Sequence, residues 1–71
     1  MFHEINNDVK IDFSVPMALQ ELIDMAEEAD QAGSIGKYYA YVDAIDTTAK
    51  NCYASGAITK KQWETILNRY V

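Results

Sequence analysis

Side chains able to carry catalysis or bind metal are few in this 71-residue chain, and their spacing forms no recognisable reactive site. One histidine, His3, and one cysteine, Cys52, are too few for a zinc site of ordinary composition. Asp43 and Asp46 lack the alternating oxygen ligands and the glycine of a calcium loop. No glycine-rich phosphate loop or nucleophile with a neighbouring base is present. The sequence therefore predicts a protein that is not an enzyme and uses no metal or cofactor.

A row of carboxylates between residues 21 and 30 is the main chemistry that the sequence offers. Closely spaced negative charges on one rigid helix steer a basic partner, and carboxylates one turn apart are separated by about 5 to 6 Å, comparable to phosphates along a nucleic-acid strand. We therefore expect a nucleic-acid mimic that covers a basic surface of a larger protein; the alternative is a merely solvated face. The expected partner-binding residues are Glu21, Asp24, Glu27, Glu28, Asp30, Tyr39 and Tyr41.

Tyr39 and Tyr41 are included because they cannot both point inward. On a helix of 3.6 residues per turn they are separated by about 200°, so at least one is expected to be partly exposed. Exposed tyrosines frequently anchor protein interfaces.

The element that must position these residues is a central helix in the stretch 34–54. Its apolar residues recur with spacings of three and four, as do those of the segments before and after it. The connections are short, so neighbouring helices should pack antiparallel. The sequence predicts a mostly α-helical fold, a small three-helix bundle with helices near 16–32, 36–55 and 60–70.

Local signals mark the ends of these helices. Ser14 with Pro16 is typical of a helix start, and glycines after the first and second helices are natural left-handed caps. Thr59 and Gln62 have the spacing of a capping box. Ile58, just before this cap, is expected to pack onto Trp63 as a hydrophobic staple.

The N-terminal residues 1–13 do not have a helical pattern. Val9, Ile11 and Phe13 alternate with polar residues, which predicts a short β-strand, and Phe2 to Ile5 offers a hairpin partner across an Asn-Asn turn. An isolated hairpin is marginal in water. The alternatives are an extended arm lying across the helices and a strand paired with a second copy of the chain.

Length, composition and charge limit the domain organisation and the cellular location that we expect for the protein. The length allows one domain, with residues 1–13 as a strand or arm and residues 14–71 as the bundle. Because a small core favours self-association, a homodimer is an open alternative. The net charge is −5 at pH 7, and residues 1–46 hold ten acidic but two basic side chains. One cysteine, no signal-peptide pattern and no membrane-spanning run predict a cytoplasmic protein.

A second class of function uses the basic C-terminal helix. Lys60, Lys61 and Arg69 are expected to face outward there, and the pair of helices around Gly56 evokes a helix-turn-helix DNA reader. The turn lacks the usual spacing of that motif and the rest of the chain would repel DNA, so direct nucleic-acid binding is disfavoured. A third class is a homo-oligomeric structural module.

The run from Tyr38 to Tyr70 resembles small helical proteins of bacterial prophages and other mobile elements. The residues that carry the resemblance are Asp43, Gly56-Ala57-Ile58-Thr59, Gln62-Trp63 and Arg69-Tyr70. The resemblance implies a setting in which small acidic proteins often inhibit or regulate host machinery, anti-CRISPR proteins among them. It implies no individual functional residues.

Overall fold

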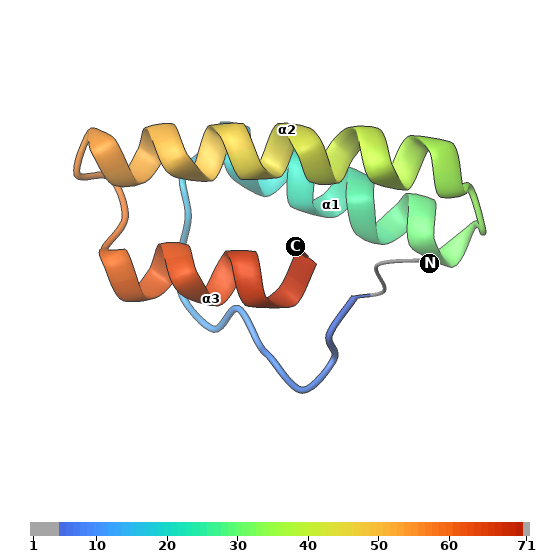
Figure 1. Ribbon diagram of the computed structural model, residues 1–71, viewed down its shortest axis with the longest axis horizontal. Coiled ribbons are helices and arrows are strands. Elements are labelled where there is room, and N and C mark those ends of the chain that lie inside the picture. The colour runs from blue at the N-terminus through green and yellow to red at the C-terminus, as the bar shows by residue number, and fades with distance from the viewer. Residues whose placement is uncertain (1–4, 71) are drawn as a thin grey trace.

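Three helices and an N-terminal arm make up residues 5–70, the part of the chain that this computed structural model describes. Helix α1 spans Met17–Gln31, α2 spans Ile35–Ala54 and α3 spans Lys60–Tyr70. Figure 1 shows α2 running along the top, with α1 and α3 antiparallel to it and beneath it. The three helices expected from the sequence are thus confirmed.

The two helix connections are built on left-handed glycines. Gly33 has φ +72° and Gly56 has φ +82°, a conformation that costs glycine little because it has no Cβ. The amide of the residue after each glycine donates to a carbonyl near the end of the preceding helix. Ser34 N donates to the Ala29 carbonyl at 2.9 Å, and Ala57 N donates to the Cys52 carbonyl at 2.8 Å. These tight turns reverse the chain direction, so that each helix packs antiparallel to the one before it.

Helix α3 begins with the expected capping box. Gln62 N donates to Thr59 Oγ1 at 3.1 Å, and Thr59 N donates to Gln62 Oε1 at 2.9 Å. These two bonds satisfy amides that a helix start would otherwise leave unpaired. Ile58 is buried, and Trp63 packs against the same core.

Helix α1 begins differently from the expectation. The capping position is Pro16, whose carbonyl accepts from the amides of Leu19 and Gln20, and no side chain caps this end. Ser14 lies two residues upstream and makes no cap. The fixed ring of Pro16 sets the entry into the helix without a hydroxyl acceptor.

The predicted N-terminal strand does not form within residues 5–70, and the segment 5–16 is instead an extended arm. Residues 1–4, the other half of the predicted hairpin, lie outside the described residues. The arm follows α3 and then crosses to α1 (Figure 1). Part of its polar backbone is hydrogen-bonded without a partner strand, because Asn6 N donates to the Arg69 carbonyl and Val9 N to the Asn6 carbonyl.

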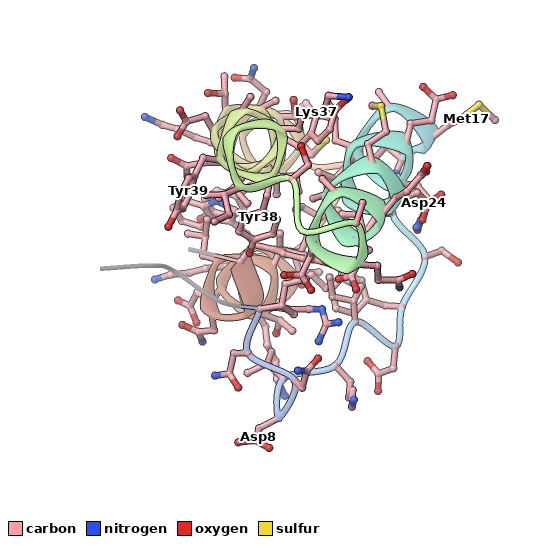
Figure 2. All side chains as sticks on the ribbon, turned by 90° about the vertical axis from the view of Figure 1, so that its right-hand side faces the viewer. Asp8, Met17, Asp24, Lys37, Tyr38 and Tyr39 are labelled. Carbon is pink, nitrogen blue, oxygen red and sulfur yellow. The ribbon has the colours of Figure 1, made fainter. Side chains whose placement is uncertain are left out.

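The core lies where α2 meets the other two helices. Seen along the bundle, the helices form a triangle, and the arm lies across the open side between α1 and α3 (Figure 2). Apolar arm residues join the core there: Ile5 is buried, and Ile11, Phe13 and Val15 pack against it. The largest fully buried side chains are Leu19, Ile45, Ile66 and Tyr70. No helix within residues 5–70 is long and apolar enough to cross a bilayer.

Candidate protein-binding surface

The carboxylates of α1 divide between two sides of the helix. Glu21, Asp24 and Glu28 fall within an arc of about 60° and are all exposed; we call these three residues the acidic stripe. Figure 2 shows Asp24 on the outer side of α1, away from α2 and α3. Asp30 is exposed as well, but it lies about 180° around the helix from Glu21. The expectation of one common acidic face is therefore wrong for part of the set.

Glu27 is the acidic residue that turns inward. Its carboxylate faces the last turn of α3, where Arg69 Nη2 lies 3.0 Å from Oε2 and the Tyr70 hydroxyl donates to the same oxygen at 2.6 Å. Glu27 neighbours the apolar stripe of α1, since it stands one turn after the buried Ile23. A carboxylate at that border is within reach of the third helix while its side chain stays 30% exposed.

Arg69 holds three parts of the molecule together. Besides Glu27 on α1, its guanidinium donates to the carbonyl of Val9 at 2.8 Å and that of Asn6 at 3.3 Å, both in the arm. It also lies 3.2 Å from the Tyr70 hydroxyl on its own helix. We call this group, Arg69 with Glu27, Tyr70 and the two arm carbonyls, the Arg69 clamp.

The clamp shifts the ionisation of its members. Burial raises the pKa of the Tyr70 hydroxyl, and the hydrogen bond to the Glu27 carboxylate raises it further. Burial lowers the pKa of Arg69, but its hydrogen bonds to Tyr70 and Glu27 outweigh that effect and the net pKa is raised. Both residues therefore keep their neutral-pH protonation, a neutral phenol and a cation, well into alkaline solution.

The basic residues expected to form an alternative DNA surface do not lie together on one exposed surface. Lys60 and Lys61 are exposed in the first turn of α3. Arg69 was expected to face outward, but its side chain is 13% exposed and committed to the clamp. It was misassigned because its partners stand about 40 to 60 residues away in the chain. Eight or nine residues of helix, about 13 Å, separate it from the lysines.

The two tyrosines expected at the interface lie on opposite flanks of α2. Tyr41 is half-buried on the side of α1, where it shares a hollow with Met25 and Glu28. Tyr39 points to the other flank in Figure 2 and packs its ring against Tyr38, with centroids 5.8 Å apart. Tyr41 is therefore placed beside the acidic stripe and Tyr39 is not.

Two exposed methionines on α1 belong to the same side and were not anticipated as site residues. Met17 is 77% exposed and Met25 is 36% exposed, and both fall on the arc of the acidic stripe or next to it. The signal was present in the sequence, because Met17 and Met25 stand four residues before and after Glu21.

No group of His, Cys, Asp or Glu side chains within residues 5–70 could hold a metal ion. Cys52, half-buried, is a free thiol packed against the core. Comparison of the chain with protein-family models, curated proteins and solved structures gives no match. The functional interpretation therefore rests on the geometry of the described residues.

Proposed function

We propose that this chain is a non-enzymatic protein-binding module that presents the acidic stripe of α1 to a basic surface of a larger protein. The observation that carries the proposal is the lack of neutralisation on that stripe. Within residues 5–70 the ion pair is Arg69–Glu27, so Glu21, Asp24 and Glu28 have no basic partner of their own. Asp24 accepts a hydrogen bond from Gln20 at 2.9 Å, which leaves its charge in place.

The stripe stands on a firm support, which favours its use in binding. Helix α1 buries Leu19, Ile23, Ala26 and Ala29 against the core, and the clamp ties it to α3 through Glu27. Carboxylates on a rigid helix leave little backbone entropy to be lost when a partner docks. They also raise the rate of encounter with an oppositely charged surface.

The kind of partner follows from this chemistry. A basic, nucleic-acid-binding surface is complementary to regularly spaced carboxylates, so we propose inhibition or regulation by nucleic-acid mimicry, as in anti-CRISPR-like proteins. A cytoplasmic setting in a prophage or other mobile element belongs to the same proposal. Direct DNA binding receives less support from the geometry, since Arg69 is engaged in the clamp. Homo-oligomerisation stays an alternative that light scattering across a dilution series decides.

The test is charge reversal with a matched control. We expect the immobilised chain to capture a basic protein from host lysate at low salt and to release it at high salt, because salt screens exposed charges. The variant Glu21→Lys/Asp24→Lys/Glu28→Lys should capture nothing while keeping its helical circular-dichroism spectrum. A control reversing three exposed acids on α2 and α3 should behave as the unmodified chain: Asp43, Asp46 and Glu64. Equal capture by both triple variants would refute the proposal.

A further inference from the structure

An open hollow of about 320 Å³ lies on the outer surface where the end of α1 meets the start of α2. Ala29 and Ala32 line it from α1, and their small side chains leave space that no neighbour fills. Met25 borders the hollow on α1 and Tyr41 borders it on α2. Apolar groups thus line one part of a depression large enough for a side chain from another molecule, and Glu28, Ser34 and Lys37 line the rest.

Charge around the hollow is uneven. Glu28 lines it from α1 and the rest of the acidic stripe continues along that helix, whereas Lys37 is the basic residue among its lining. Figure 2 shows Lys37 above the seam between α1 and α2, with Asp24 on the far side of α1. An occupant with basic groups over α1 and an apolar group over the seam matches this arrangement.

We propose that the hollow receives the apolar side chain of a basic amphipathic helix on the partner protein. This inference rests on the proposed function, and it adds the shape of the ligand to the sign of its charge. The lysines and arginines of the partner helix lie over Glu21, Asp24 and Glu28, and its apolar anchor enters between Met25 and Tyr41.

The methionines support a helical occupant. Met17 and Met25 are eight residues apart, about 12 Å along α1, which equals roughly two turns of a helix laid beside it. Methionine side chains are flexible and polarisable, so they adapt to varied apolar anchors. Recognition of an amphipathic helix in a groove uses anchors at such spacings.

Synthetic peptides supply the probe. One is an 18-residue helix-forming peptide with lysine and arginine on one face and leucine on the other; the second has the same composition in scrambled order, with no apolar face. Affinities are measured by isothermal titration calorimetry against the whole chain. We expect the amphipathic peptide to bind more tightly than the scrambled one, since both carry the same charge.

Filling the hollow separates shape from charge. Ala32→Leu adds apolar volume without touching a carboxylate, and should weaken binding of the amphipathic peptide by at least about tenfold. Ala54→Leu is the control, because Ala54 is also exposed and lies about 20 Å along α2 from Tyr41. It should bind as the unmodified chain does.

A variant that should bind more tightly separates a specific loss of binding from a loss caused by misfolding. Lys37→Glu removes the positive charge from the rim and places an acid in the first turn of α2, where the helix dipole favours it. It should bind the amphipathic peptide roughly fivefold more tightly.

The outcomes distinguish the hollow from the acidic stripe. Unchanged affinity in Ala32→Leu, or equal binding of the scrambled peptide, would overturn the inference, and so would the absence of any binding. In either of the first two outcomes, the triple variant Glu21→Lys/Asp24→Lys/Glu28→Lys is tested against the peptide as well. If this variant fails to bind, the proposed function stands and only the role of the hollow is refuted. Self-association abolished by Ala32→Leu would assign the hollow to a second copy and also overturn the inference.

Discussion

Replacing Arg69 with alanine should remove more stability than replacing any other basic residue of α3. The substitution deletes the ion pair with Glu27 and the hydrogen bonds to the carbonyls of Asn6 and Val9. It leaves the Glu27 carboxylate with the Tyr70 hydroxyl as its remaining partner in the clamp. Helix propensity is not lost, since alanine is a good helix former, but the favourable interaction of the Arg69 cation with the C-terminal end of α3 is removed.

The magnitude follows from burial. Breaking a fully buried ion pair costs about 3 to 5 kcal/mol, whereas an exposed pair contributes about 0 to 1 kcal/mol. Arg69 is 13% and Glu27 30% exposed, so the pair lies between these limits. With the two arm contacts included, we expect a loss of about 2 to 3 kcal/mol. A chain of this size has about 4 to 10 kcal/mol in total, so the midpoint should fall by about 10 to 20 °C.

Two measurements check this prediction. Urea and thermal denaturation followed by circular dichroism give the loss in the free energy of unfolding. Hydrogen exchange reports on the arm, because the amide of Val9 donates to the Asn6 carbonyl that Arg69 also binds. We expect this amide to exchange faster in Arg69→Ala, in excess of the change in global stability.

The controls are on the same helix. Lys61→Ala changes an exposed charge and should stay within about 0.5 kcal/mol of the unmodified chain. Arg69→Lys keeps the charge but loses the planar guanidinium with its several donors. Its stability should therefore fall between that of Arg69→Ala and that of the unmodified chain. An Arg69→Ala variant as stable as Lys61→Ala, with unchanged exchange at Val9, would refute the role assigned to the clamp.

Two further predictions concern pH and backbone conformation. The raised pKa of Tyr70, caused by burial and then by Glu27, keeps the native phenol neutral where the unfolded one ionises near its ordinary 10.0. Unfolding free energy should therefore fall above pH 10 by up to about 1.4 kcal/mol per pH unit from this group; Tyr70→Phe should flatten that slope in alkaline urea titrations, and an identical slope would contradict the assignment. Gly56→Ala should cost about 1 to 2 kcal/mol because φ is +82°, although a Cβ there meets nothing within 4 Å. Gly36→Ala, inside α2 at negative φ, should instead stabilise by about 0.5 to 1 kcal/mol, and the same sign for both in thermal melts would count against this reasoning.

Much of the fold was available from neighbouring residues. The repeat of three and four placed the three helices to within one or two residues, and the Thr59–Gln62 box and the glycine caps marked their ends. These signals act between residues at most five apart, so a local pattern contains them. The start of α1 was less accurate, because both Ser14 and Pro16 are acceptable there and only the backbone path selects between them.

The candidate site was predicted less completely. That α1 carries exposed acids followed from their spacing, and Glu21, Asp24 and Glu28 do stand outward together. The inward turn of Glu27 did not follow, because it depends on a helix that begins more than thirty residues later. The period-two pattern of Val9 to Phe13 predicted a strand, but it describes equally an extended arm with one side on the core.

The sequence by itself determined three helices, the glycine caps of α1 and α2, the capping box of α3, the acidic character of α1 and the scarcity of reactive groups. Each depends on residue type and on contacts within about one turn of the chain. Tertiary structure alone decided that Arg69 joins Glu27 and the arm, that Tyr41 rather than Tyr39 accompanies the acidic stripe, and that a hollow opens beside Ala32. These features join residues distant in sequence, and their positions are set by how the helices pack rather than by any local preference.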